Sequence, residues 1–194
     1  TRAPAADASV TVRLQVADDA QFTRLRVERE LSALAEHDHC LRVRVEGLQP
    51  GQRYHYRFLR LQAGEWVSSP PGITRTAPAA NAATGGLRFA FMSCQDFGGR
   101  WYNTLVPLLD QELDFILHLG DFIYESVGDA SFQDVDAERS ITFTDIEGAL
   151  RIGKRGNDYL AAASLDNYRQ LHREYRTDPV LQALLERAPL VAIW

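Results

Sequence analysis

The chain has 194 residues, of which 45% are hydrophobic and 24% are charged, a composition ordinary for a soluble globular protein of one or two domains. Its formal net charge is −5, without any block of Lys or Arg to grip a nucleic-acid backbone or an anionic membrane. No apolar run approaches the roughly 20 residues that span a bilayer. We therefore expect neither a nucleic-acid partner nor a membrane span.

The first part of the chain alternates apolar and polar residues in short segments, which is typical of half-buried antiparallel strands. Residues 9–16 (SVTVRLQV) and 41–47 (LRVRVEG) are two such segments, and in the second Leu41, Val43 and Val45 share one face. These segments predict a small antiparallel β domain at the N-terminus.

Residues 47–58, GLQPGQRYHYRF, have the spacing of a tyrosine corner, in which a tyrosine hydroxyl returns to the backbone a few residues upstream. Leu48, Pro50, Gly51 and Tyr54 carry this spacing. We therefore predict that the first domain is a β-sandwich of the fibronectin type III kind.

Residues 68–86, SSPPGITRTAPAANAATGG, are dense in Pro, Ala, Gly and Ser, which favours a linker over a packed element. We predict a first domain over residues 1–79, a linker over 80–86 and a second domain over 87–194. The two cysteines, Cys40 and Cys94, then fall in different domains, and no disulfide framework is indicated.

The second domain begins with a strand, a helix and a second buried strand, which together predict a βαβ unit and a parallel sheet. These elements are residues 87–94 (LRFAFMSC), 102–113 (YNTLVPLLDQEL) and 114–121 (DFILHLGD). The fold class is therefore α+β or α/β with two domains.

Helical patterns follow at residues 164–176 and 178–188, and the apolar segment 189–194 (PLVAIW) predicts a further strand. Thr177 or Asp178, with Pro179, is suited to cap the second helix. Residues 125–163 exceed the usual length of a loop, so we expect a functional lid over the site.

Ligands of an open parallel sheet bind beyond the carboxyl ends of its strands. Cys94 ends the first strand, while Asp121 and Tyr124 follow the second. A thiolate, a carboxylate and a phenolate at one point form an anionic cluster that is costly unless a cation neutralises it. A hard trivalent ion such as Fe(III) would suit the two oxygens and tolerate the sulfur.

Plainer interpretations compete for each polar residue. Cys94 alone is more often a small buried side chain, Asp121 alone can cap a turn, and Tyr124 alone would usually pack in a core. His118 alternates with Leu117 and Leu119, which favours a satisfied core histidine.

Two other polar groups favour structural roles. The cluster EHDHC, with His37, His39 and Cys40, leads directly into an alternating strand, so we do not expect it to bind a metal. The acidic residues of the long loop are most simply a solvated face; they are Asp129, Asp134, Asp136 and Glu138.

The chain resembles the PhoD-like alkaline phosphatases, which belong among the calcineurin-like and purple-acid-phosphatase-like metallophosphoesterases. The resemblance covers nearly the whole chain. It rests on residues 47–58, 88–97 (RFAFMSCQDF), 114–126 (DFILHLGDFIYES) and 167–194 (NYRQLHREYRTDPVLQALLERAPLVAIW). The combination of Ser-Cys-Gln with Gly-Asp-x-x-Tyr-Glu is far more specific than Gly-Asp alone.

The resemblance implies roles for three residues. Cys94 and Tyr124 would be ligands of Fe(III), and Asp121 would be the catalytic carboxylate that bridges the iron to a second metal, Ca(II). It also implies phosphate ester hydrolysis by two metals, with small-molecule phosphate esters as substrates. Secretion or a periplasmic location, by the twin-arginine route in bacteria, is implied as well.

In relatives, the strand that resembles residues 189–194 is followed by an Asp-Asp-His-Glu motif, an asparagine and a distal His-bearing motif, which complete both metal sites. The chain contains none of these motifs. We therefore expect an internal fragment with its first sandwich strand missing and its metallophosphoesterase domain truncated. Such a fragment should be inactive, bind at most one metal in part, and self-associate through its incomplete sheet.

Two alternatives to a phosphatase remain open. The first is a binding module, in which the fibronectin-like domain recognises a surface or polymeric ligand and the α/β part is structural. The second is a metalloenzyme that catalyses another reaction on the same scaffold. A binding module needs no metal, whereas the phosphatase requires Cys94, Asp121 and Tyr124 to face one pocket.

Overall fold

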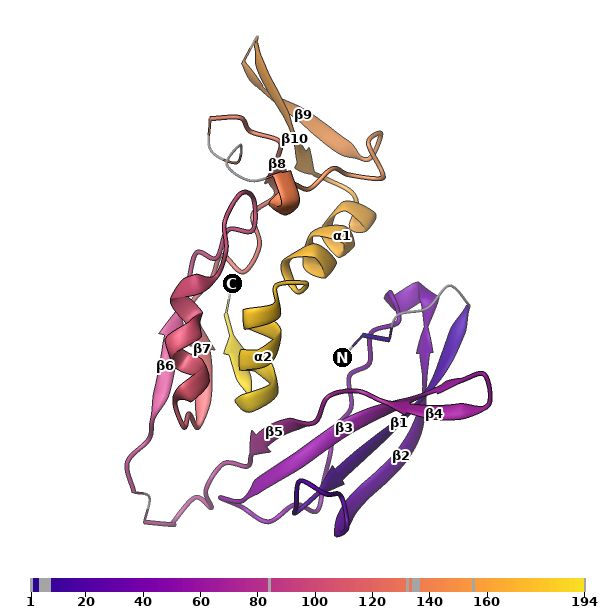
Figure 1. Ribbon diagram of the computed structural model, residues 1–194, viewed down its shortest axis with the longest axis vertical. Helices are drawn as coiled ribbons and strands as arrows, with labels where there is room; N and C mark the ends of the chain where they lie inside the picture. Colours follow the sequence, from indigo (N-terminus) through magenta and orange to yellow (C-terminus); the bar gives the residue numbers. More distant parts are fainter. Residues whose placement is uncertain are drawn as a thin grey trace. The chain divides into compact units, whose positions relative to one another are not determined.

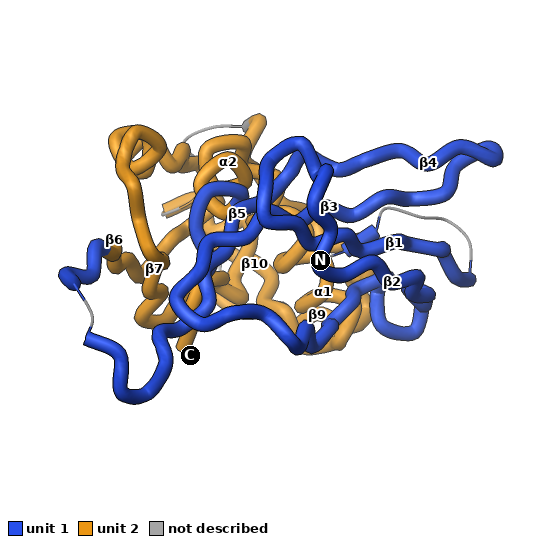
Figure 2. Tube along the Cα trace, turned by 90° about the horizontal axis from the view of Figure 1, so that it is seen from below, with its two compact units in different colours: residues 1–88, 186–189 blue, residues 89–185, 190–194 orange. Residues whose placement is uncertain are grey.

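The computed structural model describes residues 2–3, 8–83, 85–131, 133, 137–154 and 156–193. Asp134 and Asp136 of the acidic loop, and both terminal residues, lie outside this part of the chain. The fold has two compact units, coloured separately in Figure 2. Unit 1 comprises residues 1–88 with 186–189, and unit 2 comprises residues 89–185 with 190–194.

Unit 1 is built on one five-stranded sheet whose strands all pair antiparallel (Figure 1). The strands are β1 (Ser9–Ala17), β2 (Leu25–Leu34), β3 (Arg53–Gln62), β4 (Glu65–Ser68) and β5 (Gly72–Arg75). Their order is β2-β1-β3-β4, and β5 pairs with the first residues of β3. The strand predicted over residues 9–16 is thus confirmed as β1.

The core of unit 1 follows the alternation of β1. Val12, Leu14 and Val16 are 2–3% exposed, and Leu14 and Val16 pack against Tyr54 of β3. Valine and leucine at every second position place all three side chains on one face of the sheet.

The strand predicted over residues 41–46 is not found, because this segment has no ladder partner in the part of the chain that the structure describes. Its alternation still predicts the burial correctly. Val43 and Val45 pack against the buried cluster of the sheet, whereas Arg42 and Arg44 are exposed. The segment therefore packs on the sheet through its apolar side chains without joining a ladder.

The predicted tyrosine corner is present. The side chain of Tyr54 is buried, and its hydroxyl oxygen accepts the backbone N–H of Gln49 at 2.8 Å. This bond ties the turn before β3 to the strand itself.

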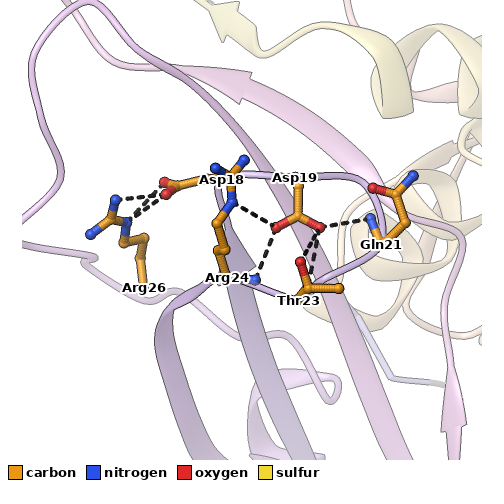
Figure 3. Close-up of polar contacts among 6 residues, drawn as sticks. All are labelled: Asp18, Asp19, Gln21, Thr23, Arg24 and Arg26. Carbon is orange, nitrogen blue, oxygen red and sulfur yellow. Dashed lines mark hydrogen bonds and ion pairs between the residues drawn. The ribbon is translucent and has the colours of Figure 1, made fainter.

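A carboxylate organises the connection between β1 and β2 (Figure 3). Oδ1 of Asp19 accepts the backbone N–H groups of Gln21 and Thr23 at 3.2 and 3.1 Å, and Oδ2 accepts that of Arg24 at 2.9 Å. These bonds lower the pKa of Asp19 from 3.8 to about 2, with the Thr23 backbone as the largest cause. The side chain thus replaces the hydrogen bonds that a regular turn would supply.

No helix or strand occurs among the described residues of the segment 76–88. Unit 2 begins directly after it, at Phe89. The linker predicted over residues 80–86 lies within this segment.

Unit 2 contains a parallel sheet with strand order β11-β7-β6 (Figure 1). The predicted parallel pairing of the strands in this region is confirmed. Its strands are β6 (Phe89–Met92), β7 (Phe115–His118) and β11 (Leu190–Ala192). Ile116 of the central strand is fully buried, as expected of the middle strand of a parallel sheet.

The connection between β6 and β7 differs from the α-helix predicted over residues 102–113. It is the 3₁₀ helix η2 (Asn103–Asp110), with Pro107 inside it. Proline lacks the backbone N–H that an α-helix requires and clashes with the preceding turn, so the regular helix is not formed.

Residues 125–163, predicted as one long loop, contain regular secondary structure, and their role as a lid over the site stays a prediction. They contain β8 (Ser126–Val127), η3 (Ala137–Arg139), β9 (Ala149–Lys154) and β10 (Asn157–Ala162). The three strands form an antiparallel sheet in the order β8-β10-β9. In β9 the alternation of Leu150 and Ile152 ends at Gly153, so the sequence predicts this hairpin only weakly.

Both predicted helices are present. Helix α1 (Leu165–Tyr175) begins with a capping box formed by Ser164 and Asn167. Helix α2 (Pro179–Arg187) is capped by Asp178, whose Oδ1 accepts the backbone N–H groups of Val180 and Leu181 at 2.9 Å. Within the described ranges, neither helix nor any other is long and apolar enough to cross a bilayer.

Candidate metal centre

The loops after β6 and β7 are hydrogen-bonded to each other beyond the ends of the strands. The backbone N–H of Cys94 donates to the carbonyl of Gly120, and that of Gln95 donates to the carbonyl of Asp121, each at 3.2 Å. Parallel neighbouring strands end at the same edge of the sheet, so their loops meet there.

The backbone at this edge is left-handed at three positions. Cys94 has a φ of 56°, Asp121 a φ of 53° and Gly120 a φ of 122°. A left-handed conformation costs a residue with a side chain on the order of 1–3 kcal/mol and concentrates at functional sites. The strain at Cys94 and Asp121 marks this edge as a candidate site.

The three predicted ligands meet at one oxygen atom. Oδ2 of Asp121 lies 3.6 Å from Sγ of Cys94 and 3.1 Å from the hydroxyl oxygen of Tyr124. Cys94 and Asp121 are exposed, and Tyr124 is half-buried. The structure therefore brings a thiol, a carboxylate and a phenol together at a solvent-accessible point.

Tyr124 holds its proton in this arrangement. Burial raises the pKa of the Tyr124 phenol above its ordinary value of 10.0, and the hydrogen bonds to Cys94 and Asp121 raise it further. A phenolate beside a carboxylate would place two negative charges in contact, so only a cation would favour the loss of this proton.

His118 lies in the core, as its alternation predicted. Its side chain is fully buried, and its ring lies 5.0 Å from that of Phe122. Burial lowers the pKa of His118 below 6.5, although the charge of Asp121 opposes this shift. Nδ1 accepts the backbone N–H of Gly120 at 3.4 Å, while Nε2 has no hydrogen-bond partner among the described residues.

The EHDHC segment does not gather its side chains around a point. His39 is buried with Nδ1 3.3 Å from the carbonyl oxygen of Ala33, whereas Cys40 is exposed with Sγ 3.7 Å from the carbonyl oxygen of Asp38. Within the described ranges, no group of three or more His, Cys, Asp and Glu side chains could hold a metal. The candidate centre contains only two side chains of these four types, those of Cys94 and Asp121. The third candidate ligand, Tyr124, is a tyrosine.

The acidic loop contains a structural carboxylate. Oδ1 of Asp129 accepts the backbone N–H of Ser131 at 3.0 Å and the side-chain amide of Asn157 at 3.1 Å. It thereby fixes the turn after β8 to β10, rather than forming part of a solvated face. Glu138 is exposed.

Three further residues contact the loops of the candidate ligands: Gln95, Asp96 and Tyr175. Gln95 belongs to the Ser-Cys-Gln motif noted in the sequence, whereas Asp96 and Tyr175 are not predicted as site residues, and only the position of Asp96 two residues after Cys94 points to it. Tyr175 lies 51 positions after Tyr124, and its position at the end of an amphipathic helix predicts only burial.

The comparisons with known proteins cover both units. The profile of the PhoD-like phosphatase N-terminal domain matches residues 1–78, and that of the PhoD-like phosphatase matches residues 89–194. The chain is 30% identical over 187 residues to alkaline phosphatase D of Bacillus subtilis (strain 168), across 96% of this chain and 28% of that protein.

A solved structure of PhoD is similar to the chain with a TM-score of 0.74 and 30% identity, across 96% of this chain and 32% of that one. The chain thus spans about a third or less of the length of these relatives. Since profiles of one family match both parts of the sequence, the chain belongs to the PhoD-like phosphatases.

Proposed function

We propose that the complete protein hydrolyses phosphate esters at a metal centre held in part by Cys94, Asp121 and Tyr124. The observation that carries the proposal is the convergence of Sγ of Cys94 and the hydroxyl of Tyr124 on Oδ2 of Asp121, at 3.6 and 3.1 Å. Membership of the PhoD-like phosphatases supports the reaction class.

The donor chemistry fits a metal. All three side chains are acids, and their deprotonated forms repel one another unless a cation lies between them. Carboxylate and phenolate oxygens suit a hard ion such as Fe(III), and a carboxylate can also serve a second hard ion such as Ca(II). We propose that Cys94 and Tyr124 bind iron and that Asp121 bridges the two metals.

The roles of the protein's own residues follow from their charge. Asp121 would provide the carboxylate shared by the two cations, and Cys94 and Tyr124 would supply negative charge that tunes the Lewis acidity of the iron. When bound, the metals supply positive charge for the phosphoryl oxygens and lower the pKa of water. The sequence has no Gly-x-Ser-x-Gly motif for a serine nucleophile.

The activity is proposed for the whole protein, because the chain spans 28% of the curated relative. Further ligands, supplied by the rest of the protein, would complete both metal sites. We propose a secreted or periplasmic location and small-molecule phosphate esters as substrates. The tyrosine corner of unit 1 supports a fibronectin type III-like module, and the strand-end ligands of unit 2 support part of a metallophosphoesterase domain.

Taken alone, the 194-residue chain should self-associate. Its parallel sheet exposes large apolar side chains, whose exposed fractions are 47% for Phe89, 70% for Phe91, 51% for Val191 and 54% for Ile193. Among the described residues β6 pairs with β7 alone, and apolar surface next to such a sheet edge favours association with other chains.

The experiment compares the full-length protein with the 194-residue chain, measuring hydrolysis of p-nitrophenyl phosphate and bound iron and calcium in both. We expect turnover with both metals in the full-length protein and negligible turnover in the chain alone. A full-length protein that folds but has neither metal nor turnover would favour a binding module. Metal without phosphatase turnover would favour a metalloenzyme with another reaction.

A further inference from the structure

One buried hydroxyl joins the two loops that carry the candidate ligands. Tyr175, the last residue of α1, is 1% exposed. Its oxygen accepts the backbone N–H of Tyr124 at 3.1 Å, and its hydroxyl donates to Oδ1 of Asp96 at 3.3 Å. Tyr124 belongs to the loop after β7, and Asp96 follows Cys94 by two residues in the loop after β6.

A second buried bond joins the same loops. The side-chain amide of Gln95 donates to the carbonyl of Phe122 at 3.1 Å. Asp96 is itself fixed, because Oδ1 also accepts the backbone N–H of Gly98 at 3.2 Å. Gln95 and Asp96 are 7% and 6% exposed, so water competes little for these bonds.

The ring of Tyr175 is held independently of its hydroxyl. It packs against Phe97 with the ring centroids 5.5 Å apart. Replacing Tyr175 by phenylalanine therefore keeps the packing and removes the hydrogen bonds of its hydroxyl, among them those to Tyr124 and Asp96.

We propose that Tyr175 is a positioning residue for the candidate metal centre, holding the backbone of Tyr124 against the loop of Cys94. The three candidate donors then converge before any metal binds. The inference deepens the proposed function and rests on it. Its geometric part, however, concerns the metal-free protein and is tested there.

The first test measures amide hydrogen exchange of Tyr124 in the metal-free full-length protein. In Tyr175→Phe, exchange at this amide should be about 2- to 12-fold faster, the factor expected for one net hydrogen bond. Tyr102→Phe is the matched control, because Tyr102 is also buried but its hydroxyl has no hydrogen-bond partner among the described residues. The control should leave exchange at Tyr124 unchanged.

The second test titrates ferric iron into the same proteins. Loss of a group that orients a ligand costs about 10- to 100-fold in metal affinity, so Tyr175→Phe should bind iron more weakly by this factor while Tyr102→Phe should not. Should Tyr175→Phe not fold, Asp96→Asn serves instead, because it weakens the bond to Tyr175 and keeps the shape of the side chain.

The outcomes separate this inference from the proposed function. Unchanged exchange at Tyr124 in Tyr175→Phe overturns the positioning role, as does equal iron affinity in Tyr175→Phe and wild type. Wild-type protein that binds no iron overturns the proposed function, and the positioning role falls with it. Equal losses of affinity in Tyr175→Phe and Tyr102→Phe would show a merely structural effect and also overturn the role.

Discussion

The hydroxyl of Tyr124 donates a hydrogen bond to Oδ2 of Asp121 across 3.1 Å. Both residues follow β7, and the backbone of Asp121 is left-handed, with a φ of 53°. Cys94 approaches the same oxygen from the neighbouring strand. A single carboxylate oxygen is therefore the meeting point of two loops.

Tyr124→Phe should abolish the phenolate-to-iron charge-transfer band of the iron-loaded full-length protein, because phenylalanine has no oxygen that could bind ferric iron. The raised pKa of Tyr124 means that binding must displace its proton, so iron affinity should increase with pH. Absorption spectra over a pH series measure both effects. A band that persists in Tyr124→Phe would show that another group is the chromophore. Tyr102→Phe is the control for the loss of a tyrosine and should keep the band.

The residues at the ends of β6 and β7 were predictable from the sequence because apolar runs indicate where these strands lie. The parallel pairing of β6 with β7 then brings the loops after them together. Cys94, Asp121 and Tyr124 were found in this way. Tyr175 was not, because its bonds to Tyr124 and Asp96 depend on the path of α1, which no local pattern encodes. The β9–β10 hairpin is not predicted because the apolar alternation of Leu150 and Ile152 is too short to indicate a strand. The α-helix predicted over residues 102–113 is wrong because Pro107 lies inside it.

Arg139→Met should lower the free energy of unfolding by about 3–5 kcal/mol, because it leaves the buried carboxylate of Asp178 without its ion-pair partner. Nη2 of Arg139 lies 3.0 Å from Oδ2 of Asp178, with the side chains 4% and 1% exposed. The two atoms are not aligned as a hydrogen bond, so the attraction is mainly between charges. Urea unfolding measures the loss.

The double variant Arg139→Met, Asp178→Asn is the control for this pair. Asparagine removes the charge but still caps α2, so the double variant should be more stable than Arg139→Met alone. A double variant as unstable as the single one would show that packing of Arg139, whose guanidinium lies 3.7 Å from the ring centroid of Phe97, matters more than its charge.

Tyr54→Phe should destabilise unit 1 by about 0.5–1.5 kcal/mol, the net contribution of one hydrogen bond, since it removes the bond to the backbone N–H of the exposed residue Gln49. Tyr56→Phe on the same strand is the matched control, because no hydrogen bond of the Tyr56 hydroxyl is found among the described residues. Thermal unfolding compares the two variants. Equal losses would contradict a specific role for the tyrosine corner.

Asp19 should stabilise the turn between β1 and β2 at neutral pH but not in strong acid. Its folded pKa of about 2 lies below the ordinary 3.8, so its contribution is complete above pH 3.8 and is lost as the pH falls toward 2. Asp19→Asn should therefore lower the melting temperature at pH 6, with the difference from wild type closing between pH 4 and pH 2, a window set by these two values. A difference in melting temperature that is independent of pH would contradict this account. Asp158→Asn, which removes an exposed carboxylate of β10, is the control.

The most direct test of the proposed centre is the metal content and turnover of full-length Asp121→Asn beside wild type, with Asp158→Asn as the control. A carboxylate that bridges two metals has no neutral substitute, so Asp121→Asn should lose iron, calcium or both, and p-nitrophenyl phosphate hydrolysis should fall by several orders of magnitude. Asp158→Asn should retain both metals and full turnover. Wild-type turnover with unchanged metal content in Asp121→Asn would contradict the assignment of this edge of the sheet as the catalytic metal centre.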